Sequence, residues 1–178
     1  EAFKLCVTSL PQVLSHPNDL AARGRLLLGA AFAGTAIENS MLGAAHSAAN
    51  PLTAHYGIVH SQAVGVMLPP VVRFNAQDPT ARRAYAELAS APEIACVSEG
   101  LDQAVAALVA RLEALLNAAQ MPRSLAECGV EHSVIPTLAE EAVRQWTAGF
   151  NPRSVTAPDF VALYEAAMQP RGDGDKSA

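Results

Sequence analysis

Apolar side chains recur along most of this chain at the three- and four-residue spacing that places them on one face of an α-helix. The clearest run is Leu101, Val105, Leu108, Leu112, Leu115 and Leu116. A second run starts almost at residue 1, with Phe3, Cys6, Val7, Leu10, Val13 and Leu14. No convincing alternation of polar and apolar residues indicates a strand, and Pro69-Pro70 argues against a central strand in the apolar stretch 64–72. The pattern predicts an all-α, multi-helix bundle.

Helix-start signals divide the chain into segments. Asn18-Asp19 suits the N-cap of a long Ala-rich helix. Three further segments open with a hydroxyl and an acid three residues later, the capping-box pattern: Ser124 with Glu127, Thr137 with Glu140, and Thr156 with Asp159. Together with the breaks at Pro and Gly, these signals predict helices near residues 2–14, 19–37, 40–54, 60–74, 78–89, 101–119, 124–128, 137–147 and 157–168.

Composition supports a folded helical protein. Ala, the best helix former, occurs 36 times in 178 residues, whereas aromatic residues make up only 5%. The hydrophobic fraction of 51% excludes disorder, and a net charge of −5 gives no electrostatic footprint for nucleic acid. No uninterrupted apolar run approaches the roughly 20 residues of a membrane helix, because polar and Gly positions break the stretch Leu26–Leu42. We expect residues 170–178 to be a disordered tail.

The three cysteines are few, odd in number and far apart. Cys6, Cys96 and Cys128 form no CxxC pair. This usage indicates buried, reduced thiols of a cytoplasmic protein rather than a disulfide framework or a zinc site.

Three of the five histidines, His46, His55 and His60, lie within fifteen residues. His46 stands on a predicted helix beside small residues, and His60 opens the next helix, so the two side chains could converge on one cation. The spacing alone favours the alternative, that these are ordinary surface or core histidines, because two ligands do not complete a site. His55 at a helix end suits a structural role, and His16 and His132 suit surface positions.

The segment from Gly34 to Asn75 resembles the signature of the iron-containing (group III) alcohol dehydrogenases. The matching elements are Ala33-Gly34, Asn39-Ser40-x-Leu42-Gly43-x-x-His46, His60 fourteen residues later, Leu68-Pro69 and Arg73-Phe74-Asn75. The distal half also agrees, at Leu125, Gly129-Val130, Ile135-Pro136, Leu138-Ala139, Asn151-Pro152-Arg153 and Thr156-x-x-Asp159. The resemblance covers residues 1–169.

This resemblance implies an all-helical, metal-binding domain over residues 1–169, from an enzyme that uses Fe²⁺ or Zn²⁺ together with NAD(P) to interconvert small alcohols and aldehydes or ketones. The family holds its metal with an Asp, a His four residues later and two further histidines, and the last two match His46 and His60. No Asp-x-x-x-His occurs in this chain, and neither does the glycine-rich turn of the nucleotide-binding domain. We therefore expect the N-terminal nucleotide-binding domain to be absent from this chain, and the isolated chain to bind metal weakly and to be inactive.

One departure from the family pattern concerns the proton relay. The family usually has a His four residues after the first of these two ligands, near the substrate and nicotinamide, where this chain has Asn50. Asn50 can hydrogen-bond a substrate oxygen but cannot transfer a proton near neutral pH. It is nevertheless the candidate catalytic residue. Another departure is Ser61, where Gly usually follows the second ligand.

The surroundings of this site leave alternatives open. Leu42, Phe32 and Phe150 either line a substrate pocket or belong to the core. The turn Asn151-Pro152-Arg153 either lies near that pocket or links helices, with Arg153 in a salt bridge, and Arg73-Phe74-Asn75 is expected to cap a helix. For the whole chain, the alternative to a dehydrogenase domain is a catalytically inert helical domain that serves assembly or partner binding. An apolar face left without its partner domain also predicts a homo-oligomer.

Overall fold

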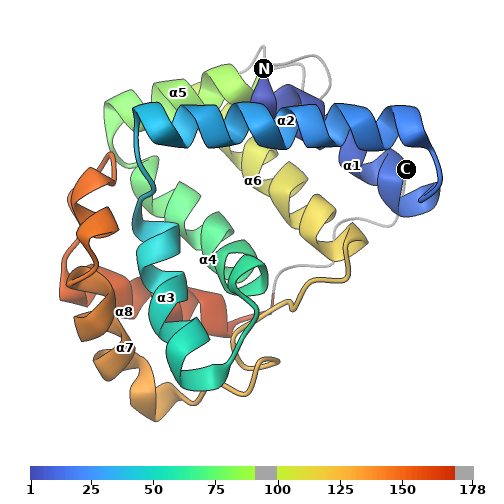
Figure 1. The fold of residues 1–178 in the computed structure, drawn as a ribbon. Helices are drawn as coiled ribbons and strands as arrows, with labels where there is room; N and C mark the ends of the chain where they lie inside the picture. Colours follow the sequence, from blue (N-terminus) through green and yellow to red (C-terminus); the bar gives the residue numbers. More distant parts are fainter. Residues whose placement is uncertain (91–99, 171–178) are drawn as a thin grey trace.

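A computed structural model describes residues 1–90 and 100–170, and in these ranges it contains helices and turns but no strand (Figure 1). The all-α prediction is therefore confirmed. The α-helices are α1 (Ala2–Ser15), α2 (Leu20–Asn39), α3 (Ala44–Tyr56), α4 (His60–Asn75), α5 (Pro79–Ala89), α6 (Leu101–Ala118), α7 (Ile135–Val143) and α8 (Ala157–Met168). Two short 3₁₀ helices, η1 (His132–Val134) and η2 (Trp146–Phe150), flank α7.

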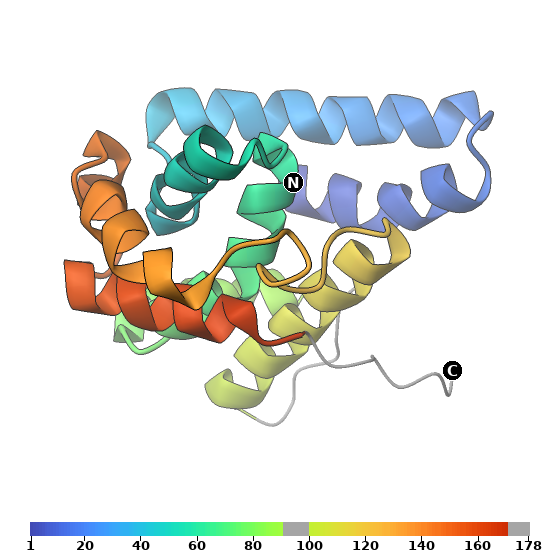
Figure 2. The ribbon, with the colours of Figure 1, turned by 90° about the horizontal axis from the view of Figure 1, so that it is seen from below.

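Helices α1 and α2 form an antiparallel pair at one side of the molecule, and α8 lies on the opposite side (Figures 1 and 2). The two helices approach each other closely because a glycine faces α1: a Cβ on Gly29 would lie 2.8 Å from Cys6 Sγ and 3.0 Å from Leu5 Cβ. Apart from α2, α1 packs mainly on α6. The pair is therefore attached to the rest of the domain chiefly through α1.

The main core lies among α3, α4, α7 and α8. Its largest fully buried side chains include Tyr164 and Phe160 of α8, Leu52 of α3 and Met67 of α4. The Tyr164 hydroxyl donates a hydrogen bond of 2.7 Å to the Ala48 carbonyl, which joins α8 to the middle of α3. Burial raises the pKa of Tyr164, so this hydroxyl keeps its proton.

A smaller core joins α5 and α6 to the other face of α4. Val72 of α4 packs there with Ala86 and Ala89 of α5 and with Leu108 of α6. Helix α4 thus lies between the two cores and remains helical through Pro69 and Pro70. Proline removes an amide donor from a helix interior, and burial on both sides of α4 offsets that loss.

Side-chain caps decide several helix starts, as the sequence indicates. Asp19 accepts hydrogen bonds from the amides of Ala21 and Ala22 at the start of α2. Thr156 and Asp159 form the predicted capping box of α8, which confirms that helix boundary.

The prediction of a helix over 137–147 started and ended too late. Helix α7 begins at Ile135 with Pro136 in its first turn, so Thr137 lies inside the helix and does not cap it. Pro136 sets this start because its missing amide hydrogen costs nothing in a first turn. The helix ends at Val143, and the chain continues into the 3₁₀ helix η2.

The predicted helix over 124–128 is wrong, because this segment forms turns. Ser124 Oγ does accept from the Glu127 amide at 3.2 Å, as in half a capping box. The Glu127 carboxylate, however, accepts from the Arg123 amide, and the Leu125 amide donates to the Ala167 carbonyl of α8. A tertiary contact with the end of α8 therefore replaces the next helical turn.

Cys6 and Cys128 are both partly buried, and burial raises the pKa of the Cys6 thiol. Their burial is less complete than predicted, and the reduced state of the thiols stays a prediction. Cys96, the predicted break at 91–100 and most of the predicted tail lie outside the described residues.

Helix α2 buries only Ala22 and Gly29, and its large apolar side chains are exposed, Leu27 at 72% and Phe32 at 43%. Over the described residues, α2 is the one helix long and apolar enough to cross a membrane by length and composition. The glycine and polar interruptions noted in its sequence do not prevent this match. One such match is weak evidence for a membrane span.

Candidate metal centre

The structure places His46 and His60 side by side, although fourteen residues separate them. Their ring centroids lie 5.5 Å apart, with the ring planes at 51°. His46 lies in the first turn of α3 and His60 is the first residue of α4. Gly57, in the left-handed conformation with φ 63°, ends α3 and allows the chain to turn back toward it. The sequence-predicted convergence of the two histidines is present in the structure.

The start of α3 differs from its prediction and determines where His46 lies. The helix begins at Ala44 rather than at residue 40, with Gly43 as its N-cap. The Gly43 carbonyl accepts hydrogen bonds of 3.1 Å from the amides of both His46 and Ser47. The residues before it, 41–43, are half-buried and non-helical. His46 therefore stands on the first turn of α3, beside an extended approach to the helix.

Electrostatics favours the neutral, metal-binding form of His46. Burial lowers the pKa of His46, and the neighbouring His60 lowers it further, since two protonated imidazoles would repel each other. His60 is exposed. Neutral imidazole is the form that donates a lone pair to zinc, iron and other divalent metals.

The donors present fit a divalent metal in type but not in number. Two imidazoles from adjacent helices meet, yet no group of three or more His, Cys, Asp or Glu side chains able to hold a metal gathers among residues 1–90 and 100–170. Protein zinc sites generally use three or four protein ligands. His46 and His60 would therefore supply part of the set.

Asn50 lies one helical turn beyond His46 on α3, and its amide is already engaged. Asn50 Nδ2 donates a hydrogen bond of 2.9 Å to Gln145 Oε1, just before η2. The Oδ1 atom of Asn50 is able to accept a hydrogen bond from a substrate hydroxyl. Whether Asn50 takes part in catalysis stays a prediction.

His55 lies in the last turn of α3, where its Nε2 lies 2.8 Å from a carboxylate oxygen of Glu141 on α7. This exposed contact fits the predicted structural role. His16 contacts Ser15 Oγ after α1, and His132 lies in η1.

The predicted pocket residues have different surroundings. Leu42 is half-buried before α3. Phe32 and Phe150 are 43% and 56% exposed, so the alternative that they are core residues is wrong within this chain. The Phe150 ring meets Trp146 edge to face at 5.8 Å. A role for these side chains in substrate binding remains a prediction.

Sequence reasoning missed a polar cluster that joins the turn after η2 to α3 and α4. Asn75 is 2% exposed, and its Oδ1 accepts from Asn151 Nδ2 at 2.7 Å while its Nδ2 donates to Asn151 Oδ1 at 3.1 Å. Asn75 Nδ2 also donates to the Tyr85 hydroxyl at 3.1 Å. Asn75 is the last residue of α4, so Arg73-Phe74-Asn75 lies at a helix end as expected, and the Asn75 side chain in addition bridges elements. The two Asn residues are 76 positions apart, and nothing in the sequence near either one predicts that their side chains pair.

Arg153 packs on Phe74 instead of forming the predicted salt bridge, although its charge helps to lower the pKa of Asp159. Its guanidinium donates to the Phe74 carbonyl at 3.1 Å and lies 3.8 Å from the centroid of the Phe74 ring. Arg73, which precedes Phe74 in α4, forms a salt bridge of 2.7 Å with Glu113 of α6. The turn therefore ties the segment after η2 to the end of α4, and whether it also lies near a substrate pocket stays a prediction.

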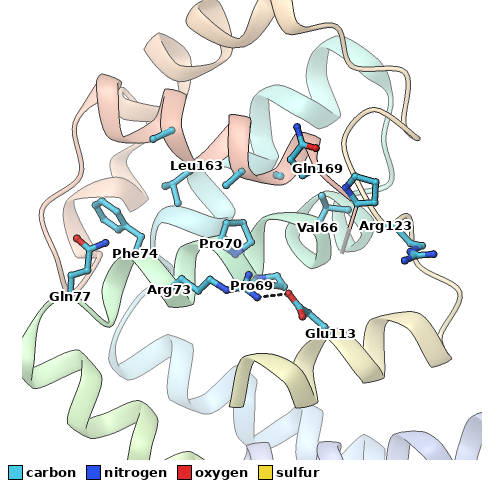
Figure 3. Close-up of a pocket in the computed structure, with 14 residues that line it drawn as sticks. Val66, Pro69, Pro70, Arg73, Phe74, Gln77, Glu113, Arg123, Leu163 and Gln169 are labelled. Atoms are coloured by element: carbon cyan, nitrogen blue, oxygen red, sulfur yellow. Dashed lines mark hydrogen bonds and ion pairs between the residues drawn. The ribbon is translucent and has the colours of Figure 1, made fainter. Parts of the chain in front are cut away.

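A hollow of about 560 Å³ lies between α4, α6 and α8 (Figure 3). Pro69, Pro70, Phe74 and Leu163 form its apolar wall, and the Arg73–Glu113 pair stands at its edge. Neither His46, His60 nor Asn50 lines it. This hollow is therefore separate from the histidine pair.

Comparison with known proteins gives consistent matches over nearly the whole chain. A family model described as "Fe-containing alcohol dehydrogenase family, C-terminal" matches residues 1–168. Lactaldehyde reductase of Escherichia coli (strain K12) is 35% identical over 153 residues, which are 86% of this chain and 40% of that protein. 1,3-Propanediol dehydrogenase of Klebsiella pneumoniae is 30% identical over 171 residues, which are 94% of this chain and 43% of that protein.

A solved structure supports the same relation. The crystal structure of a 1,3-propanediol oxidoreductase matches 93% of this chain and 43% of its own, with a TM-score of 0.88 and 26% identity. The chain spans about two fifths of the length of these two curated relatives.

Proposed function

The chain belongs to the Fe-containing alcohol dehydrogenase family, as its C-terminal domain, and we propose that it supplies the metal-binding half of an NAD(P)-linked enzyme that interconverts small alcohols and aldehydes or ketones. One observation carries this proposal: His46 and His60, from two different helices, present their rings 5.5 Å apart. Relatives named for lactaldehyde, 1-propanol and 1,3-propanediol support a short-chain alcohol or aldehyde as substrate.

We propose His46 and His60 as two of the metal ligands. Fe²⁺ or Zn²⁺ held there would supply Lewis acidity, which would make an alcohol hydroxyl more acidic and polarise a carbonyl. Burial keeps the His46 imidazole neutral, so its lone pair is available without first losing a proton. The Gly43 carbonyl fixes the backbone of His46 at the start of α3.

Asn50 is the proposed polar contact for substrate. Its Nδ2 is held by Gln145, which leaves Oδ1 to accept a hydrogen bond from an alcohol hydroxyl. Since an amide does not ionise near neutral pH, the proton released from the alcohol must leave through water or another group. NAD(P), when bound, would supply the acceptor for the hydride that an alcohol loses on oxidation, and we propose no residue of this chain for holding it.

We further propose that the intact protein is a cytoplasmic homo-oligomer. Relatives are bacterial dehydrogenases and reductases, and the few, widely spaced cysteines fit a reducing compartment. The exposed apolar side chains of α2 form a surface of the kind that other protein covers.

The test is an assay of the full-length protein that carries this chain. Purified protein is incubated with NAD or NADP and a panel of short alcohols, and with NADH or NADPH and the matching aldehydes, with and without added Fe²⁺ or Zn²⁺. Metal-dependent turnover that His46→Gln and His60→Gln each abolish supports the proposal. Turnover that is insensitive to both substitutions overturns it.

Two further measurements address the inert alternative. Reading the gene upstream of Glu1 is decisive in either direction: a glycine-rich phosphate loop with an Asp-x-x-x-His favours the enzyme, and an unrelated domain favours a helical assembly module. Zinc titration of this chain alone is expected to give a dissociation constant weaker than micromolar, because it offers two ligands. Submicromolar binding by the monomer contradicts that expectation.

A further inference from the structure

The polar cluster around Asn151 lies directly against the turn that carries His46. Asn151 Oδ1 accepts a hydrogen bond of 3.2 Å from the Ala44 amide, in the first turn of α3. The same oxygen lies 2.9 Å from the position that a Cβ on Gly43 would occupy. Gly43 in turn holds the His46 amide through its carbonyl. The Asn151 side chain therefore holds the first backbone amide of α3 and also lies against Gly43, the N-cap of that helix.

Asn151 can hold this orientation because every hydrogen-bonding site of its amide is used. Its Oδ1 accepts from Ala44 and from Asn75, and its Nδ2 donates to Asn75 Oδ1 and to the Arg153 carbonyl, the latter at 2.6 Å. An amide has two acceptor positions and two donor hydrogens. A rotated amide would place a donor against the Ala44 N–H and an acceptor against the Arg153 carbonyl. The cluster thus permits one orientation only.

Asn75 connects this arrangement to the helix that carries His60. It is the last residue of α4 and almost completely buried, and its Nδ2 bonds both Asn151 and Tyr85 of α5. The beginning of α3 and the end of α4 are therefore held to the same pair of amides. His46 and His60 stand on these two helices.

We propose that Asn151, oriented by Asn75, is a positioning residue for the metal centre: it fixes the first turn of α3 and thereby the place of His46 relative to His60. This inference rests on the proposed metal centre and deepens it. Neither amide touches the histidine rings, so the effect reaches His46 through the backbone of residues 43–46. Residues that orient metal ligands from outside the ligand set typically contribute about 10- to 100-fold to metal affinity.

The experiment measures Cu²⁺ binding to this chain. Cu²⁺ binds imidazole more tightly than the other divalent first-row metals, and its electron paramagnetic resonance spectrum reports how many imidazole nitrogens coordinate it. The unmodified chain is expected to show two nitrogens, and His46→Gln and His60→Gln are each expected to show one. Asn151→Ala is expected to weaken binding about tenfold and to reduce the spectrum to one nitrogen.

Two further variants approach the cluster from other sides and keep the test decisive if Asn151→Ala does not fold. Gly43→Ala removes no polar group but places a Cβ 2.9 Å from Asn151 Oδ1, so it should weaken binding in the same direction. Asn75→Ala leaves the bonds of Asn151 to Ala44 and Arg153 and should give a smaller loss. Far-UV circular dichroism confirms that each variant is folded.

The matched control is Thr156→Ala, which removes the capping box of α8 but none of the hydrogen bonds of Asn151 and Asn75. It should lower stability yet keep the affinity and the two-nitrogen spectrum. The proposal is overturned if Asn151→Ala and Gly43→Ala keep both properties, or if Thr156→Ala loses them equally. A one-nitrogen spectrum in the unmodified chain overturns the metal centre and this inference together. Failure of the full-length protein to oxidise alcohols, with the copper results as expected, overturns only the proposed enzyme activity.

Discussion

Two glycines of α2 should respond oppositely to the same substitution. Gly24 and Gly29 both lie inside this helix, where Ala is intrinsically about 1 kcal/mol more favourable than Gly. Around Gly24 an added Cβ would meet nothing within 4 Å. Gly24→Ala should therefore stabilise the chain by up to about 1 kcal/mol.

The same methyl group at Gly29 has no room. Its Cβ would lie 2.8 Å from Cys6 Sγ, 3.0 Å from Leu5 Cβ and 3.2 Å from the Ala2 carbonyl oxygen. The sulfur could rotate away, but a backbone oxygen and a Cβ move only with the whole of α1. Overpacking of this kind costs about 1–3 kcal/mol. After the propensity gain is subtracted, Gly29→Ala should be destabilising by up to about 2 kcal/mol.

Urea unfolding followed by far-UV circular dichroism measures both variants. The difference between their free energies of unfolding should be about 1–3 kcal/mol in favour of Gly24→Ala. Gly34→Ala serves as a second control, since nothing lies within 4 Å of its added Cβ. Equal stability of the Gly24 and Gly29 variants would refute the close packing of α1 on α2.

Three further predictions concern the main core, a helix cap and the exposed face. Tyr164→Phe removes the hydrogen bond to the Ala48 carbonyl of α3 and should lower the free energy of unfolding in urea by about 1 kcal/mol. An unchanged free energy of unfolding would contradict this bond. The hydrogen bond from the Thr156 hydroxyl lowers the pKa of Asp159 below its unfolded value of 3.8; its stabilisation is therefore present above that pH and lost as the pH falls through the lower folded pKa. Asp159→Asn should abolish this component of the pH dependence, and an unchanged acid unfolding profile contradicts it. Leu27→Glu, at a position 72% exposed, should keep the helical content but reduce association in light scattering, unless the chain is already monomeric, which would contradict the assembly proposal.

Local signals explain why so much of the helix map could be predicted from sequence. The apolar spacing of residues 101–116 depends only on the geometry of a single helix, and α6 spans Leu101–Ala118. Asp19 and the Thr156–Asp159 box act within one turn, and both caps form as predicted. The predictions over 124–128 and 137–147 were wrong where a contact outside the segment or a proline changed the local outcome.

The candidate site divides in the same way. The family signature indicated His46 and His60, and the turn at Gly57 brings them together within a short stretch of chain. Asn75 and Asn151 are 76 residues apart, and the residue type alone does not show whether an Asn is buried or exposed. Gly43 likewise looks like any helix-start glycine until Asn151 is placed against it.

By itself the sequence determined the helical class and most helix positions, and it indicated His46, His60 and Asn50 as candidate site residues. Periodicity, helix caps and the spacing of a short motif are all local features of the chain. The tertiary structure decided which side chains are buried and which amides meet. It showed that α2, apolar by composition, leaves most of its surface exposed in this chain, and that paired amides from two distant turns fix the helix carrying His46. Burial and long-range pairing depend on how helices pack against one another, and no short window of sequence contains that information.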